Sequence, residues 1–266
     1  MDDTSLEIHD GIALIRFLQA QRLNVFSPQM IEDLGRHYRR CDEDPAVRVV
    51  VVTGSGDAFC AGAEIGNGEV FVADAEAPPV DSCPLSFQAW DIRKPVIAAC
   101  NGHAIGIGLG IALQCDMRIF SLEGKYGLLQ NRRGVVADFG VEYLLPRLVG
   151  FERAFELLVR ANRLDGAEAL AWGLCSRAVG AKDVLETALG IAADMVSNCS
   201  PLVRGMHKRL LWRGLDLPRD ALVALETRAL DHSMRAPDAR EGGMAWVQKR
   251  PPVWRAFEEA DWPEFL

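Results

Sequence analysis

The stretch that most constrains the fold of this chain runs from Lys94 to Phe120. It opens with a continuous run of small apolar residues, Val96 to Cys100, which is typical of a strand buried on both faces. Asn101-Gly102 then predicts a turn. Glycines follow at every second position from Gly106 to Gly110, just before a helix-like segment. Glycine lets another group approach the backbone closely, and the first N–H groups of a helix have no partner within it. The stretch therefore predicts one half of a site for negative charge.

The other half of such a site is predicted about forty residues earlier. The apolar run Val49 to Thr53 reads as a strand, and Gly54 to Asp57 predicts the turn that follows it. The chain then continues through Phe59 to Ile65, which contains a second glycine turn. Two successive units of strand and glycine turn can present two backbone N–H groups to one carbonyl oxygen. An enolate needs this geometry.

Strand-like and helix-like segments alternate through the first two-thirds of the chain, which indicates βαβ units with parallel strands. After Asp138 every remaining segment reads as a helix, so we expect an all-helical C-terminal part. Residues 66–82, with acidic residues and two prolines, are interpreted as a loop that could serve as a lid. The expected strands are 6–9, 12–17, 47–53, 96–100 and 115–120. The expected helices are 28–41 (capped by Ser27), 84–92, 139–149, 151–160, 165–174, 181–197, 201–212, 218–233 and 238–248.

Composition excludes several classes of function. The 266 residues carry a formal net charge of −8, which argues against a nucleic-acid partner because phosphate binding needs a basic face. No apolar run has the length of a membrane span, and the first residues lack the features of a signal peptide. The seven cysteines form no Cys-x-x-Cys pair, and the five histidines lack metal-ligand spacing. We therefore expect a cytoplasmic protein with reduced, mostly buried thiols, no metal site and no membrane or nucleic-acid partner.

Three motifs together resemble the crotonase (enoyl-CoA hydratase/isomerase) superfamily: Ala61-Gly62-Ala63-Glu64, Lys94-Pro95-Val96-Ile97-Ala98-Ala99, and Asn101-Gly102 to Gly108. The resemblance covers nearly the whole chain. It implies an α/β fold, namely a crotonase-type ββα spiral core over residues 1–197, followed by a helical C-terminal trimerisation region over residues 198–266. It also implies a homotrimer or homohexamer.

The resemblance assigns the two N–H groups of the predicted anion site to Ala63 and Ile107. Ile107 stands where the family usually has glycine, so its branched side chain is expected to narrow the pocket. Two other interpretations of the glycines remain open. They could form only a tight strand-to-helix turn, or they could bind a dinucleotide. The second fits poorly because the spacing Gly-x-Gly-x-x-Gly is missing: residue 111 is isoleucine.

The acid/base groups depart from the family pattern. Typical hydratases carry two glutamates, at the positions held here by Gly110 and Gln130. Arg132-Arg133-Gly134 followed by Asp138 resembles a subgroup with a carboxylate at that place. We expect Asp138 to move the proton, because an apolar acyl pocket raises the pKa of a carboxyl group. The alternative is that Asp138 only caps a helix starting at Phe139, and Glu142 is a secondary candidate.

Coenzyme A contacts also follow from the resemblance. The loop from Arg22 to Val25 matches the segment that lies along the pantetheine and adenine, and Ala61, Ala63 and Ile65 are expected to flank the thioester and adenine. Gly66 replaces a residue that is often lysine, so one phosphate contact is expected to be lost. Lys249, or Arg250 beside it, matches a basic residue that reaches the nucleotide phosphates, although Arg22 and Lys249 could equally be solvated surface charges.

The resulting prediction is an acyl-CoA enzyme with no tightly bound cofactor, whose substrate is carried as a coenzyme A thioester. Hydration of a 2-enoyl-CoA and a double-bond shift in a 2- or 3-enoyl-CoA share the same enolate, and the lone carboxylate fits either reaction. Two alternatives stay open at this point. One is acyl-CoA decarboxylation or hydrolysis, and the other is a relative that binds acyl-CoA but has lost catalysis.

Overall fold

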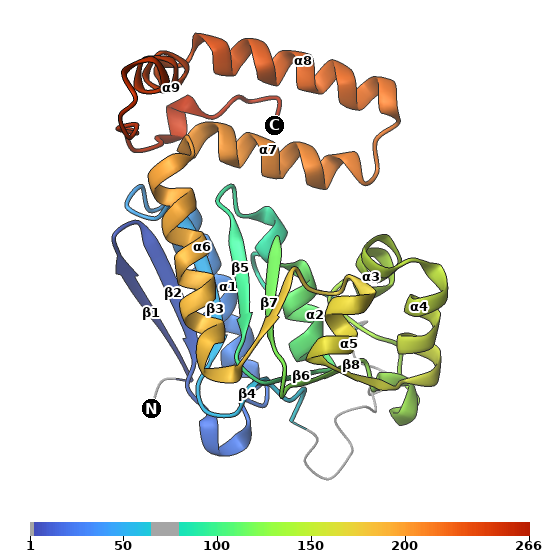
Figure 1. The fold of residues 1–266 in the computed structure, drawn as a ribbon. Helices are drawn as coiled ribbons and strands as arrows, with labels where there is room; N and C mark the ends of the chain where they lie inside the picture. The colour runs from blue at the N-terminus through green and yellow to red at the C-terminus, as the bar shows by residue number, and fades with distance from the viewer. Residues whose placement is uncertain (1–2, 65–79) are drawn as a thin grey trace.

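A twisted six-stranded sheet forms the centre of the molecule in the computed structural model, which describes residues 3–64 and 80–266 (Figure 1). The strand order is β1-β2-β3-β5-β7-β10. β1 runs antiparallel to β2, and every other neighbouring pair is parallel. The bounds are β1 Thr4–His9, β2 Ile12–Phe17, β3 Val49–Gly54, β5 Val96–Cys100, β7 Met117–Ser121 and β10 Arg177–Val179. The hairpin of β1 and β2 and the parallel strands are confirmed.

Helices cover both faces of the sheet, which accounts for the unbroken apolar runs in β3 and β5. Side chains of a strand alternate between faces, and all residues of both strands are buried. Val51 pairs with Ile97, and both pack against helix α6 (Val184–Asn198). Val52 pairs with Ala98, and both belong to the cluster on the opposite face. That cluster includes buried residues of helix α1 (Pro28–Glu43), whose predicted cap is confirmed: Ser27 Oγ accepts a hydrogen bond from the N–H of Met30.

A smaller second sheet positions the two glycine turns. Its strand order is β4-β6-β8-β9, with β8 and β9 antiparallel and the other pairs parallel. β3 leads into β4, β5 into β6 and β7 into β8, so the chain passes three times directly from the large sheet to the small one. Helix α2 (Ile107–Gln114) follows β6 directly. The strands are β4 Ala58–Cys60, β6 His103–Ile105, β8 Lys125–Gly127 and β9 Arg163–Asp165.

The expectation of an all-helical part after Asp138 is wrong in two places. The short strands β9 and β10 complete the small and large sheets within that region, and three-residue strands carry too little pattern to be read from the sequence. The expected helix 84–92 is only the 3₁₀ turn Ala89–Asp91. Helix α3 covers Val141–Val149, and α5 covers Gly166–Trp172. Between them, α4 covers Phe151–Phe155 and continues as a π-helical turn over Glu156–Arg160. The predicted lid lies mostly outside the described residues.

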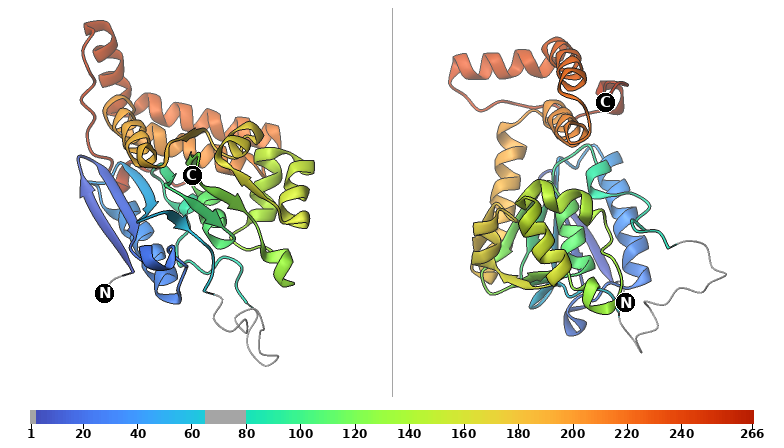
Figure 2. Two further views of the ribbon diagram at one scale, coloured as in Figure 1. Left: turned by 60° about the horizontal axis from the view of Figure 1, so that its bottom comes forward. Right: turned by 90° about the vertical axis from the view of Figure 1, so that its right-hand side faces the viewer.

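Three C-terminal helices form a separate layer beside one end of the large sheet (Figure 2). They are α7 Pro201–Gly214, α8 Arg219–Arg235 and α9 Pro237–Gln248. Their own small cluster of buried apolar residues includes Leu202, Met206 and Ala229. α7 is held to the core by polar contacts. Lys208 Nζ lies 2.8 Å from Asp116 Oδ2, and Trp212 Nε1 donates to Asp116 Oδ1 over 2.8 Å.

Candidate active site

The pairing of β4 with β6 brings the two glycine turns together. Cys60 lies opposite Ala104, and the contact continues beyond both strands. A Cβ added to Gly62 would lie 3.2 Å from the carbonyl oxygen of Ile105, and one added to Gly108 would lie only 2.2 Å from that of Cys60. Only glycine fits at 108. Ala63 and Ile107 therefore belong to two segments in direct backbone contact.

Among the described residues, the amides of Ala63 and Ile107 have no hydrogen-bond acceptor and can donate to a ligand. Phe26 forms a parallel bridge with Ala63 in which its N–H donates to the carbonyl of Gly62 over 2.8 Å, so the N–H of Ala63 itself points away from Phe26. Ile107 is the first residue of α2 and follows Gly106, whose φ of 57° and ψ of −120° are accessible to glycine alone. Within residues 3–64 and 80–266, neither amide donates to a backbone carbonyl.

Asp138 lies against the first turn of α2. Its carbonyl oxygen would be 3.6 Å from a Cβ at Gly110, and its Oδ1 accepts a hydrogen bond of 3.2 Å from Gln130 Nε2. Burial raises the pKa of the Asp138 carboxyl group to about 6. The hydrogen bond from Gln130 opposes that rise, and the charge of Glu142 adds to it. A carboxyl group with such a pKa can both take and give a proton near neutral pH.

Asp138 does not cap a helix. α3 begins at Val141, and its N-cap is Gly140. Phe139 and Gly140 have positive φ angles of 58° and 69°, so the chain makes a left-handed turn before the helix starts. The expected helix start at Phe139 is therefore wrong, and so is the interpretation of Asp138 as its cap. Glu142, the secondary candidate, is exposed in the first turn of α3.

The aromatic ring after Asp138 explains why residue 110 is glycine. A Cβ at position 110 would lie 2.9 Å from Cβ of Phe139 and 3.5 Å from its ring. Phe139 is fully buried and packs edge-on against Phe26, with ring centroids 6.2 Å apart. The space where the family usually carries a glutamate is thus filled by Phe139. The sequence signal for this pairing is a glycine at the glutamate position together with a large side chain directly after the candidate aspartate.

The predicted coenzyme A residues fall into two groups. The loop from Arg22 to Val25 lies along the segment that contains Ala61 and Ala63, since the N–H of Ala61 donates to the carbonyl of Leu23 over 3.0 Å. Arg22 also forms an exposed ion pair with Glu64. Ile65 and Gly66 lie outside the described residues. Lys249 ends α9 with an exposed side chain, in the layer of helices far from β4 and β6 (Figure 1), so one copy of the chain does not bring it to this site.

Other expectations concern the thiols, metals and membranes. All seven cysteines are free, and five of them are buried. Across the described part of the chain, no group of three or more His, Cys, Asp or Glu residues is arranged to hold a metal ion. None of the helices in the same residues is both long and apolar enough to cross a membrane.

Solved structures and curated sequences identify the class of this protein. A probable enoyl-CoA hydratase/isomerase from Mycobacterium abscessus superposes with a TM-score of 0.91 at 38% identity, covering 97% of this chain and all of the other. An enoyl-CoA hydratase from Bacillus anthracis gives a TM-score of 0.87 at 27% identity over 95% and 98% of the two chains. A carnitinyl-CoA dehydratase of Proteus mirabilis is 32% identical over 92% of this chain and 95% of its own.

The family follows from a match along the whole chain. Residues 7–257 match the model of the enoyl-CoA hydratase/isomerase family. This chain belongs to that family, and its fold is the crotonase fold predicted from the three motifs. It is accordingly an acyl-CoA enzyme of the hydratase/isomerase type.

Proposed function

We propose that this protein reversibly adds water to the double bond of a 2-enoyl-CoA, through a thioester enolate held between the amides of Ala63 and Ile107. The observation that carries the proposal is the direct backbone contact between the two glycine turns, with Asp138 against the same turn of α2. The names of the similar proteins, a carnitinyl-CoA dehydratase and enoyl-CoA hydratases, support the same kind of reaction.

In this mechanism the two amides act on the thioester oxygen. Attack of water at Cβ pushes negative charge onto that oxygen, and preorganised N–H groups stabilise the charge without rearrangement. One such donor typically contributes about 2.7–4 kcal/mol to lowering the barrier. The positive end of α2 adds to the effect, since Ile107 is its first residue.

Asp138 is the proton carrier in this mechanism. As a carboxylate it accepts a proton from the water that forms the C–O bond at Cβ. It then returns a proton to Cα, so the carboxylate is regenerated and the product carries both parts of the water molecule. A single group can do both because burial raises the pKa of Asp138 to about 6.

The lone carboxylate also favours a second reaction, the shift of a double bond between positions 3 and 2. Here Asp138 removes a proton from Cα and returns it to Cγ, and no water takes part. Phe139 fills the place of a second carboxylate, which hydration schemes of the family use and isomerisation does not need.

Three assays separate these reactions. Crotonyl-CoA loses its ultraviolet absorbance if water adds, and 3-enoyl-CoA gains the same absorbance if the double bond moves. Malonyl-type thioesters test decarboxylation and hydrolysis. We expect loss of absorbance with crotonyl-CoA, slowed by about a hundredfold or more in Asp138→Asn. An unchanged absorbance at high enzyme concentration would reject hydration, and binding of acyl-CoA without any conversion would indicate a lapsed enzyme.

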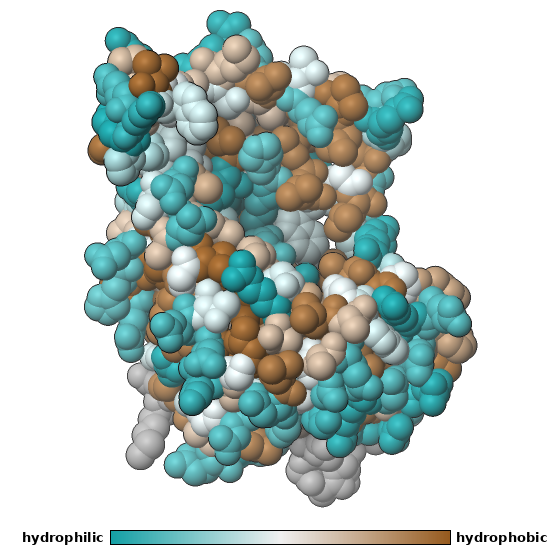
Figure 3. All heavy atoms as spheres, in the orientation of Figure 1, coloured by the Kyte–Doolittle hydropathy of each residue, from teal (hydrophilic) through white to brown (hydrophobic). Residues whose placement is uncertain are grey.

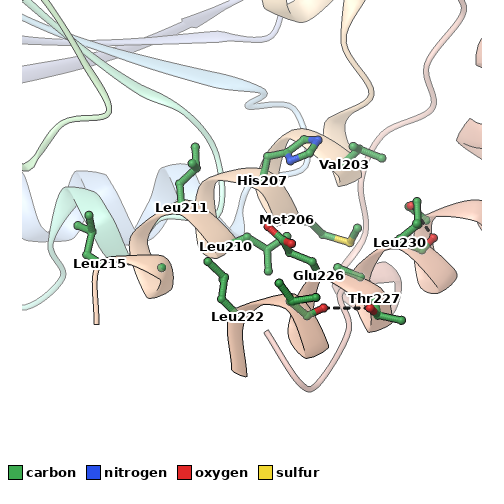
Figure 4. Close-up of a pocket in the computed structure, with 14 residues that line it drawn as sticks. Val203, Met206, His207, Leu210, Leu211, Leu215, Leu222, Glu226, Thr227 and Leu230 are labelled. Atoms are coloured by element: carbon green, nitrogen blue, oxygen red, sulfur yellow. Dashed lines mark hydrogen bonds between the residues drawn. The ribbon is translucent and has the colours of Figure 1, made fainter. Parts of the chain in front are cut away.

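We also propose that residues 198–266 form the oligomerisation region of a homotrimer or homohexamer. Apolar side chains crowd the surface of this layer (Figure 3), and a groove of about 680 Å³ runs between α7 and α8 (Figure 4). Leu211, Leu230 and Met234 are 73%, 60% and 70% exposed, which is a large apolar surface for a single chain. Lys249 can then act on coenzyme A only if another copy supplies it.

Light scattering coupled to gel filtration tests the assembly. We expect the mass of three or six chains for the wild type and a smaller assembly for Leu211→Glu combined with Leu230→Glu. Leu122→Glu, at a 44% exposed leucine on the turn after β7, is the matched control and should leave the mass unchanged. A monomeric wild type would contradict the proposal.

A further inference from the structure

Gln130 stands beside both parts of the proposed site. It is 8% exposed and opens the short turn η4 (Gln130–Arg133). Its Nε2 donates to Asp138 Oδ1, and its amide group lies against Gly106, with Nε2, Cδ and Oε1 between 3.7 and 3.8 Å from a Cβ added there. Gly106 immediately precedes Ile107, so the amide of Gln130 bridges the proton carrier and the start of α2. Its Oε1 is buried without a hydrogen-bond partner in the described part of the chain.

In the described part of the chain, Asp138 forms no ion pair with a cationic side chain. Arg132 and Arg133, in the same turn as Gln130, donate to the carbonyls of Arg160 and Leu129 instead. From α3 the charge of Glu142 faces it. From the segment ahead of η3 (Ala89–Asp91) comes the thiol of Cys83, whose pKa is raised by burial and further by nearby charges that include Asp138. Gln130 is thus the one described side chain that donates a hydrogen bond to the carboxyl group.

We propose that Gln130 is a positioning residue for the reaction, whose amide orients the Asp138 carboxyl group and offers a partner to both its ionised and its protonated form. This inference rests on the proposed role of Asp138 as the proton carrier. It assigns Gln130 a role in orienting Asp138 and not in proton transfer, because glutamine cannot exchange protons near neutral pH.

The chemistry of a primary amide explains how one residue can serve both forms. The NH₂ group donates to a carboxylate, and the carbonyl accepts from the O–H of a carboxylic acid. When Asp138 takes up a proton, rotation of the amide presents Oε1, which otherwise has no partner, to the new O–H. A glutamate at position 130 would instead place a second negative charge beside Asp138, and an apolar residue would offer neither contact.

Carbon NMR of the unliganded protein, labelled at the aspartate side chains, tests this directly. The Asp138 signal is identified by its absence in Asp138→Asn, and its titration in the wild type should give a pKa of about 6. In Gln130→Met the carboxylate loses its donor, so the pKa should rise by roughly one pH unit. Asn131→Met is the matched control, because the exposed Asn131 of the same turn donates to the carbonyl of Val159 and not to Asp138.

Kinetics supplies the second measurement. Gln130→Met should lower kcat by roughly ten- to a hundredfold, with KM nearly unchanged, and move the acid limb of the pH profile upward with the NMR pKa. If Gln130→Met does not fold, Gln130→Glu is used, in which the second charge should raise the upper apparent pKa of the pair above the wild-type value.

An Asp138 pKa that is the same in wild type and variant overturns the role of Gln130, whether or not a substrate is known. A wild type that converts no thioester, while the pKa still moves with Gln130, rejects the proposed reaction and leaves the Gln130–Asp138 coupling established. The two failures are therefore distinguishable.

Discussion

Asp116 and Asp138 are two shielded aspartates with opposite surroundings. Asp116, just before β7, accepts hydrogen bonds from the N–H of Val96 and from Trp212 Nε1, and its Oδ2 lies 2.8 Å from the ammonium group of Lys208. Asp138 accepts one side-chain hydrogen bond, from the neutral Gln130, and no described cation lies within ion-pair distance. Asp116 is thus paired with a cation, whereas Asp138 has only a neutral hydrogen-bond donor among the described side chains.

The difference separates a structural role from a chemical one. Lys208 is almost fully buried and also donates to the carbonyls of Ala89 and Lys94, so the cluster around Asp116 joins α7 to the core. Neutralising such a carboxylate would leave a buried cation unpaired. Among the described residues Asp138 has no cationic partner to lose, and its pKa of about 6 allows its charge to change during a reaction.

Asp138→Asn should give the largest effect on activity. The amide keeps the shape of the side chain but cannot carry a proton, so kcat/KM should fall by about a hundredfold to ten-thousandfold. The melting temperature at pH 8 should not fall, because the change removes a partly buried charge that has no described cation beside it. Steady-state kinetics on the thioester found active, together with thermal unfolding, checks both. Activity within a few-fold of wild type would remove Asp138 from the mechanism.

Asp116→Asn should show the opposite pattern. It leaves the ammonium group of Lys208 buried without its counter-charge, and such a change typically costs about 3–5 kcal/mol in free energy of unfolding. Urea unfolding measures the loss, with Asp220→Asn as control, since the Arg219–Asp220 pair is 85–87% exposed and contributes little. Any surviving folded Asp116→Asn protein should keep the pH profile of the wild type. A stability equal to that of the wild type would end the contrast between the two aspartates.

The buried strands and the glycine turns are the parts of the fold and site that the sequence predicts. The apolar runs Val49 to Thr53 and Val96 to Cys100 gave the buried strands, because a strand covered on both faces must be apolar at every position. The glycines gave the contact of the two turns, because a 2.2 Å approach at Gly108 leaves room for no other residue. Both signals, an apolar run and a glycine turn, lie within single short segments, so one sequence carries them.

What escaped prediction depends on contacts between distant segments. The filling of position 110 by Phe139 joins α2 to a turn nearly thirty residues later, and the left-handed turn at Phe139 and Gly140 moved the start of α3 to Val141. The strands β9 and β10 owe their existence to neighbours already in the sheets. The cluster of Asp116 with Lys208 likewise has no local signal, because the two residues are far apart in the sequence.

Gly110→Glu restores the family's usual residue but should not restore its chemistry. The new Cβ would lie 2.9 Å from Cβ of Phe139, so the buried ring must move, and overpacking of this kind typically costs roughly 1–3 kcal/mol. Gly190→Glu in α6 is the control, because a Cβ there meets nothing within 4 Å and glycine is a poor helix former. Urea unfolding of both variants and a hydration assay decide the outcome. A stable and more active Gly110→Glu would show that Phe139 does not exclude a second carboxylate.

The smallest predicted effect is a pH dependence of stability that belongs to Asp138 alone. Its pKa is about 6 in the folded protein, above the ordinary value of 3.8, so between these values the folded state holds a proton that the unfolded chain has released. The stabilisation from the protonated group is complete below about pH 4 and is lost as the pH rises through 6.

Asparagine does not titrate, so the stability of Asp138→Asn relative to wild type should rise by up to about 2 kcal/mol between pH 4 and pH 7.5. Urea unfolding at a series of pH values measures this difference curve. Asn131→Met, which removes no titrating group, is the control, and its difference curve should be flat. A flat curve for Asp138→Asn would mean that Asp138 is ionised and well solvated throughout, in which case it resembles an ordinary surface carboxylate and not a buried proton carrier.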